Sequence, residues 1–430
     1  MNIDIEEAIN NFRSDASRYS RAERYYRGDH DLSFATDKFK NAFGSLFREF
    51  ALNLCPAICD AVRDKLKITG FSVEDEGASA DIPTADTIRR IWQDNRMPTR
   101  AGEVHKEVLK TGDAYVIVWP DAGGGVSINP NRASNCTVVY DAESQGSIVR
   151  AAKYWRAPDG RTRLNLFYPD RIEKYVSAKQ ADGWLPEAKE FVPLAEDGAD
   201  ISVVPNPFGV VPVFHFANNA DIGLSGTSEL EQAIPIQDGL NKSVLDMLVA
   251  MEFSAFRQRW AAGIEIDYDD EGKPVAPYQA GIDHLWVASN PDARFGDFDS
   301  ANLEQFLKVK DSFRTDIASV TGTPLYYLMP QLRGFPSGES LRKAETRFLS
   351  KVRDRQESFG QVWSEVMSFA ILAAKGRRVR LVTEWEDAAS QSERELLENI
   401  LLKKQIGISD EQALVEAGYG VSDASGMAAG

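Results

Sequence analysis

The sequence predicts an α+β protein, because its hydrophobic period changes twice along the chain. Helical spacing of apolar residues dominates up to about residue 110, strand-like alternation dominates residues 112–218, and helical spacing returns from Ser228. The third observation is an excursion from about Gly226 to Val320, in which a long helix, a small β-like module and a second helix follow one another. That order predicts an arm that leaves a body, carries a small module and returns.

The N-terminal part of the chain predicts helices. We expect a helix over 4–27 that ends at Gly28 and a second over about 43–66, which Pro56 kinks or splits. After a polar linker, two further helices are expected over about 85–95 and 99–110.

The middle of the chain predicts mostly antiparallel β structure over 112–218, with paired aromatic and β-branched residues. Gly123–Gly125 and Asp159–Gly160 are typical of hairpin turns. The segment NPFGVVPVFHFAN, residues 206–218, closes this region.

The first helix of the excursion is expected over Ser228–Trp260, with only Pro235 to interrupt it. Beyond Pro235 it could reach about 37 Å. Its apolar surface is broad, which indicates contact with more than one neighbour. A β-like module over about 263–299 and a second helix over 303–320 follow. The residues expected to pack in these helices include Leu240, Val244, Leu248, Met251, Phe306 and Phe313.

The C-terminal part begins with a Pro/Gly-rich segment, residues 321–340, which predicts a long irregular loop. A long helix is expected over about 338–375, closed by Gly376, followed by one strand in VRLVTEW. Ser392 and Ser409 each begin a capping box and predict two short helices. The tail after Gly418 is expected to be disordered.

Composition indicates a soluble, globular chain of 430 residues with a formal net charge of -16. A protein that grips nucleic acid through its phosphates carries a basic footprint, which this chain lacks globally. It either avoids nucleic acid or handles it without gripping. Three cysteines without regular spacing predict reduced thiols, and neither a signal peptide nor a membrane span is expected.

Catalytic and cofactor patterns are missing from the sequence. There is no P-loop, and the glycines at 123–125 fit a turn better than a dinucleotide fingerprint. The acidic run from Asp267 has Tyr278 where a calcium loop needs glutamate, so it predicts a solvated turn. His105 is expected on a polar helix face and His215 in the core. We therefore expect no cofactor, no metal and no enzymatic activity.

One local charge feature opposes the acidic composition. Between Met329 and Arg355 there are seven basic residues and three acidic ones. This strip is a candidate for facing nucleic acid or another subunit, and the alternative is a helix surface paired with acidic neighbours. Arg333 differs, because it lies in the irregular loop. The basic residues are Arg333, Arg342, Lys343, Arg347, Lys351, Arg353 and Arg355.

Several segments, in this order and spacing, resemble the portal proteins of long-tailed double-stranded DNA phages. They are YYRGDH (25–30), KTGDAYVIV (110–118), NPFGVVPVFHFAN with GTSELEQAIPIQDGLN (206–241), TGTPLYYL (321–328) and the closing region 385–420. No single segment is specific, but together they span most of the chain.

The resemblance implies a portal fold with a wing, a two-helix stem, a small β-containing clip, a tunnel loop and a short helical crown. The implied boundaries are 1–225 for the N-terminal wing, 226–260 and 303–320 for the stem, 261–302 for the clip, 321–338 for the tunnel loop, 339–390 for a long helix with the wing return strand, and 391–430 for the crown and tail. Gln331, Arg333 and Ser337 are expected to line the constriction.

The implied function is a ring, typically of twelve subunits, at one capsid vertex, through which double-stranded DNA is packaged and ejected. The implied partners are the terminase motor, the head–tail adaptor, and the capsid and scaffolding proteins, with assembly in the host cytoplasm. An acidic wall with a few loop cations suits DNA that must slide. The alternatives are a structural ring without DNA passage and an enzyme such as a nuclease, which the missing metal-ligand cluster disfavours.

Overall fold

The computed structural model describes residues 3–37, 40–41, 51–73, 82–121, 123–144, 146–180, 185–196, 199–222, 225–255, 259–263, 268–273, 290–297, 303–329, 338–389 and 393–416. These residues form helices and antiparallel sheets, as the sequence predicted. The chain divides into two compact units. The first unit holds Met1–Phe12, Asp60–Gly226 and Pro336–Gly430, and the second unit holds Arg13–Cys59 and Thr227–Phe335.

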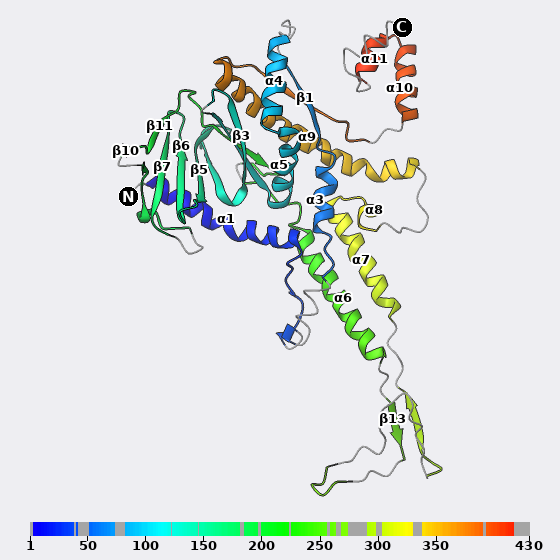
Figure 1. The fold of residues 1–430 in the computed structure, drawn as a ribbon. Helices are drawn as coiled ribbons and strands as arrows, with labels where there is room; N and C mark the ends of the chain where they lie inside the picture. Colours follow the sequence, from blue (N-terminus) through cyan, green and yellow to red (C-terminus); the bar gives the residue numbers. More distant parts are fainter. Residues whose placement is uncertain are drawn as a thin grey trace. The chain divides into compact units, whose positions relative to one another are not determined.

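Two antiparallel sheets dominate the first unit (Figure 1). The smaller has the order β12-β2-β3, so the last strand of the β region returns to the first one. The larger has the order β11-β7-β6-β5-β4, with β8 also on β7. The strands are β2 (Asp113–Pro120), β3 (Val126–Arg132), β4 (Cys136–Tyr140), β5 (Ile148–Arg156), β6 (Arg161–Phe167), β7 (Arg171–Gln180), β8 (Phe191–Pro193), β11 (Val203–Pro205) and β12 (Val213–Ala217); β9 (Ala195–Glu196) pairs with β10 (Ala199–Asp200).

Both predicted hairpin turns are confirmed. Between β2 and β3, one carboxylate oxygen of Asp121 accepts hydrogen bonds from the backbone N–H groups of Gly123 and Gly125, each at 2.8 Å. Between β5 and β6, Gly160 has a φ of 77°, a conformation that favours glycine.

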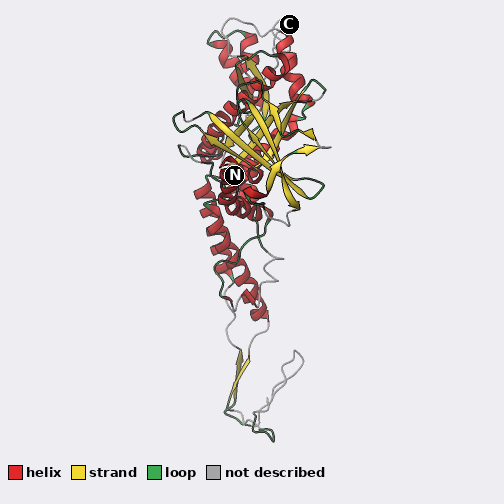
Figure 2. Ribbon diagram, turned by 90° about the vertical axis from the view of Figure 1, so that its left-hand side faces the viewer, coloured by secondary structure: helices red, strands yellow, loops and turns green. Residues whose placement is uncertain are grey.

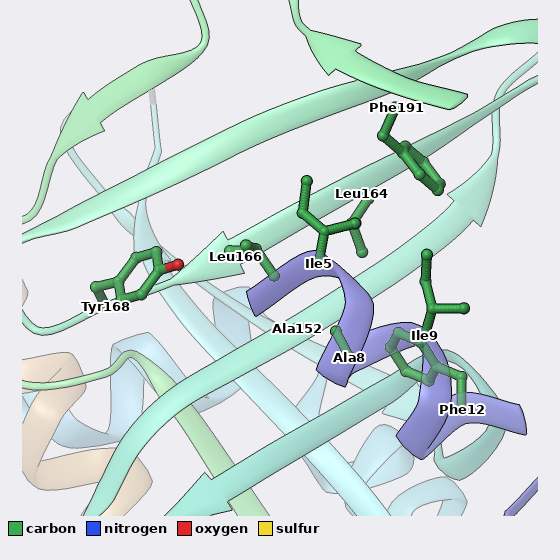
Figure 3. Close-up of a cluster of buried hydrophobic side chains, with 9 residues drawn as sticks. All are labelled: Ile5, Ala8, Ile9, Phe12, Ala152, Leu164, Leu166, Tyr168 and Phe191. Atoms are coloured by element: carbon green, nitrogen blue, oxygen red, sulfur yellow. The ribbon is translucent and has the colours of Figure 1, made fainter. Parts of the chain in front are cut away.

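Helix α1 (Ile3–Arg27) begins on the larger sheet, and its apolar residues at helical spacing point into that sheet (Figure 3). They pack against the side chains of β5, β6 and β8. On β5, Arg150 forms ion pairs with Asp4 and Glu7, and the Tyr168 hydroxyl donates to Asp4 at 2.6 Å. The packed residues are Ile5, Ala8, Ile9, Phe12, Ala152, Leu164, Leu166 and Phe191.

A second core of the first unit surrounds Trp363, which is fully buried. Its indole N–H donates to Nε2 of His105 at 2.9 Å. The prediction that His105 lies on a polar helix face is therefore wrong. Burial lowers its pKa to about 3, so the ring is neutral and accepts. The surrounding elements are α4 (Ile82–Asp94), α5 (Met97–Thr111), α9 (Gly338–Lys375), β1 (Ile68–Val73) and β15 (Leu381–Trp385), of which β1 and β15 pair.

The described part of the helix predicted over 43–66 begins only at Cys55. Helix α3 spans Cys55–Arg63, residues 51–54 are not helical, and residues 42–50 lie outside the described ranges. Pro56 does not kink the helix, because it occupies the first turn, where its missing N–H would have no partner.

The long helix of the excursion, α6, spans Ala233–Ala255 and ends earlier than predicted. Residues 259–260, assigned to this helix from the sequence, belong instead to β13 (Arg259–Ala262), which pairs with β14 (Arg294–Asp297) as a two-stranded ribbon (Figure 2). Gly296 lies opposite Trp260 and has no room for a side chain, since an added Cβ would lie 2.6 Å from the indole ring.

The second helix of the excursion, α7, spans Glu304–Thr321 and confirms the prediction. The loop predicted after it is not wholly irregular, because α8 (Leu325–Leu328) forms directly after Pro324. Proline suits the start of a helix, so Pro324 begins this turn of helix. Residues 330–337 lie outside the described ranges.

The C-terminal helices are α10 (Glu393–Gln405) and α11 (Asp410–Glu416). The Ser409 hydroxyl accepts from the backbone N–H of Gln412 at 3.3 Å, as the capping box predicts. The predicted tail, 417–430, and Ser392 lie outside the described ranges. No helix in the described part of the chain is long and apolar enough to span a membrane.

Candidate functional site: a helix pair with a buried polar junction

Helices α6 and α7 lie side by side in the second unit (Figure 1). Leu240 on α6 and Ile317 on α7 are both fully buried. Gly239 allows close approach, because a Cβ added there would lie 3.1 Å from the ring of Phe313. Leu240 is thus buried within one chain.

The outer surface of this helix pair keeps apolar side chains in contact with solvent. Val244, Leu248, Phe306 and Phe313, all predicted to pack, are half-buried. Other large apolar side chains are 38–48 % exposed. Exposed apolar side chains mark a contact with another protein where they gather into one patch. The exposed residues are Met251, which the sequence singled out, and Leu307, Val309 and Val320.

A mostly buried hydrogen-bond network, which we call the polar junction, lies near the start of α6. It consists of Tyr25, His30, Ser33, Asp238 and Asn241. The Tyr25 hydroxyl lies 2.8 and 2.9 Å from the two carboxylate oxygens of Asp238, and the Ser33 hydroxyl donates to Oδ2 at 2.7 Å. Nδ2 of Asn241 lies 2.6 Å from Nδ1 of His30, and Nε2 of His30 lies 3.1 Å from the Tyr25 carbonyl oxygen.

The neighbouring residue Gln237 extends the same polar face of α6. Its Nε2 donates to the Leu52 carbonyl at 2.6 Å, and its Oε1 accepts from the Leu54 N–H at 3.1 Å. Gln237, Asp238 and Asn241 are 0 %, 4 % and 2 % exposed. These three polar residues of α6 are therefore shielded from water.

Burial determines the protonation states of the polar junction. It raises the pKa of Tyr25, assisted by the bond to Asp238, and it lowers the pKa of His30. It also raises the pKa of Asp238, against the effect of its hydroxyl donors. A neutral His30 that donates from Nε2 to Tyr25 and accepts at Nδ1 from Asn241 fits both distances. Oδ1 of Asn241 then has no partner among the described residues.

The polar junction joins two segments that carried the resemblance. Tyr25 and His30 come from YYRGDH, whereas Asp238 and Asn241 come from IQDGLN. Both segments stand out in the sequence, but the sequence did not predict that they contact each other. The contact joins positions 213 residues apart, Tyr25 and Asp238. The feature of the sequence that could have indicated this contact is the group of polar residues at 237, 238 and 241, next to the apolar residues of the same helix.

The predicted constriction residues Gln331, Arg333 and Ser337 lie outside the described ranges. Of the basic strip, Arg347 and Arg353 are exposed on α9 but Arg355 is buried and bonded to Asp354. The described part of the strip is thus not one solvent-facing surface.

The histidine and cysteine side chains considered from the sequence have structural roles in the described part of the chain. His215 is buried and bonds Asp113 and Tyr140, each at 2.8 Å, as expected of a core histidine. All three cysteines are buried and none forms a disulfide bond, as predicted for reduced thiols. Burial raises the pKa of Cys55 and of Cys136 to about 12, which makes both thiols poor nucleophiles. Within the ranges given above, no group of His, Cys, Asp and Glu could hold a metal.

Comparison with known proteins identifies the family. The profile described as "Phage portal protein, SPP1 Gp6-like" matches residues 5–425. The portal proteins of Mycobacterium phages D29 and L5 are 24 % and 27 % identical over 386 residues, which cover 86 % of this chain and 76 % of each relative. Solved chains from the virion of a native gene transfer agent and from the neck of an empty gene transfer agent particle align with TM-scores of 0.47 and 0.48, at 14 % identity, over 89 % of this chain and 92 % and 93 % of theirs. Because the profile spans nearly the whole sequence, the chain belongs to the SPP1 Gp6-like family of phage portal proteins.

Proposed function

We propose that this chain is the subunit of a ring at one capsid vertex, and that double-stranded DNA passes through the ring during packaging and ejection. The observation that carries this proposal is the family match over residues 5–425. The exposed apolar side chains of α6 and α7 support it, because a closed ring would cover them with neighbouring subunits.

In this proposal α6 and α7 form the stem, the segment that contains β13 and β14 forms the clip, and residues 1–225 with α9 and β15 form the wing. The tunnel loop follows α8, and α10 with α11 forms a short crown. Four large apolar side chains of α10 and its end are 50–78 % exposed, which fits further subunit contacts there. They are Leu397, Leu401, Leu402 and Ile406.

The charge of the chain supports passage rather than tight binding of DNA. A net charge of -16 would make most of the channel wall repel phosphate, while loop cations such as Arg333 would guide it. The chain has no ATPase motif, so the proposal assigns packaging work to a separate terminase motor and no catalysis to the ring. The clip would dock this motor and then the head–tail adaptor, and the ring would contain twelve subunits.

Mutations in the tunnel loop test DNA passage. We expect Arg333→Ala, alone and with a deletion of loop residues, to lower the amount of DNA retained per particle several-fold, because the loop would lose its guiding charge. The measurement is nuclease-protected DNA in purified particles. Arg353→Ala removes an exposed charge from α9 and is the matched control. Wild-type packaging and retention in every loop variant would contradict the assignment of Gln331, Arg333 and Ser337 to the constriction.

Acidic substitutions on the stem surface test the ring. Met251→Asp with Leu307→Asp should destabilise the folded chain by no more than about 1 kcal/mol, because each side chain is already nearly half exposed. Assembly should fail, since it would bury unpaired carboxylates. Light scattering and particle incorporation measure this. Ile222→Asp, at a side chain 89 % exposed, is the control, and normal rings from the double variant would remove these residues from the interface.

A further inference from the structure

Burying the polar groups of the junction costs free energy, because these groups lose their hydrogen bonds to water. A carboxylate at Asp238 has left water almost completely, with 4 % of the residue exposed, and burial works against its ionised form. Apolar residues of similar volume at such a site are often as stabilising or more so. Stability alone therefore does not explain why hydrogen bonds occupy this position.

The hydrogen bonds of the junction are directional, which apolar contacts are not. The Tyr25 hydroxyl lies between both oxygens of Asp238, and Ser33 approaches one of them from a different part of the chain. His30 adds a further bond, to Asn241, one turn further along α6. Three points on the N-terminal segment thus reach α6 through directional bonds.

The N-terminal side of the junction is itself held firmly. Helix α1 ends at Arg27, and the next residue, Gly28, has a φ of 86°, which favours glycine; the Asp29 N–H donates back to the Arg24 carbonyl at 2.9 Å. The Arg24 guanidinium binds Asp29 at 2.9 Å and Asp31 at 2.6 Å. The turn that carries His30 and Ser33 is therefore tied to the end of α1 by a backbone hydrogen bond and two ion pairs.

We propose that Tyr25, His30 and Ser33 are positioning residues, which act through Asp238 and Asn241 to set the direction of α6 relative to the end of α1. Their role is geometric: the hydrogen bonds select one orientation among those that a similar apolar contact would allow. The inference concerns one chain and can fail or hold independently of DNA passage.

The test separates orientation from stability. Spin labels are placed at Ser20→Cys on α1 and Glu252→Cys on α6, both exposed, while the native cysteines are buried. Pulsed electron spin resonance then gives the distribution of distances between the labels. We expect one narrow distribution for the otherwise wild-type chain.

Two junction variants are compared in that background. Tyr25→Phe with Asp238→Leu removes the buried hydroxyl of residue 25 and the carboxylate of residue 238 together. Ser33 is exposed, so its hydroxyl can then form a hydrogen bond with water. We expect the melting temperature to match or exceed that of wild type, with a distance distribution at least about twofold broader or displaced. The single substitution Asp238→Asn keeps an acceptor for the Tyr25 hydroxyl and supplies an N–H donor to the Ser33 hydroxyl. This variant should therefore retain the narrow distance distribution of the wild type.

Each outcome bears on the proposal. A folded double variant with the narrow wild-type distribution would overturn it, because apolar contact would position α6 equally well. Broadening by Asp238→Asn equal to that of the double variant would also overturn it, since charge and not hydrogen-bond geometry would then set the orientation. If the double variant does not fold, Tyr25→Phe alone is judged by the same distributions, with intermediate broadening expected.

Discussion

Replacing Gly226 by alanine is expected to destabilise the first unit by about 3 kcal/mol or more. A Cβ at this position would lie 2.0 Å from the carbonyl oxygen of Gly112 and 2.6 Å from the backbone nitrogen of Asn218. Both are backbone atoms, and they are bonded to one another at 2.8 Å, so neither can move aside cheaply. The Gly226 N–H also donates to the buried carboxylate of Asp113 at 2.8 Å, a bond that any displacement would lengthen.

Urea unfolding of Gly226→Ala measures this effect. Gly102→Ala is the matched control, because Gly102 lies within α5 and an added Cβ meets nothing within 4 Å. Alanine should stabilise that helix by up to about 1 kcal/mol. A Gly226→Ala chain that unfolds at the wild-type urea concentration would contradict the close packing around Gly112.

Acidification is expected to weaken the first unit through His105. Its pKa is lowered to about 3 in the folded chain, against about 6.5 in an unfolded chain. Between these two pKa values the unfolded chain binds a proton that the folded chain does not. The contribution of His105 to the free energy of unfolding is therefore fully present above the unfolded pKa and is lost as the pH drops towards 3. From pH 7 to pH 5 the loss from this group is about 2 kcal/mol.

Comparison with His105→Gln isolates that contribution, because other groups also titrate. The glutamine carbonyl oxygen can still accept from the Trp363 N–H, but it does not bind a proton in this range. We expect the wild-type chain to lose about 2 kcal/mol more than the variant between pH 7 and pH 5, measured by urea unfolding at each pH. Equal losses in the two proteins would show that His105 titrates normally.

Local signals in the sequence predicted much of the fold. The end of α1 at Gly28, the turns at Gly124 and Gly160, and the cap at Ser409 all depend on residues within a few positions of one another. Their conformations follow from glycine at positive φ or from a side chain that bonds its own backbone. Such features need no knowledge of the rest of the chain.

Features that depend on distant partners were missed. His105 stands between Glu103 and Lys106 in the sequence, yet it lies on the buried face of α5 because Trp363 covers it. The end of α6 was placed too late, since pairing of Trp260 with Gly296 replaces helix by strand. The sequence could mark the polar residues of α6 as unusual, but not that Tyr25 and His30 bind them.

The exposed surface of the helix pair was also only partly predicted. Helical spacing placed Met251 among the apolar residues expected to pack. Spacing cannot show which of these residues the partner helix leaves uncovered. That question depends on the packing of α6 on α7, which buries Leu240 and Ile317 and leaves Leu307 in solvent.

Electron cryo-microscopy of the ring within assembled particles tests the central proposal most directly. The proposal predicts a closed ring around an open channel, with α6 and α7 of each subunit packed against those of the next and with Met251 and Leu307 buried between subunits. A ring in which these side chains face solvent, or an assembly with no open channel, would contradict it.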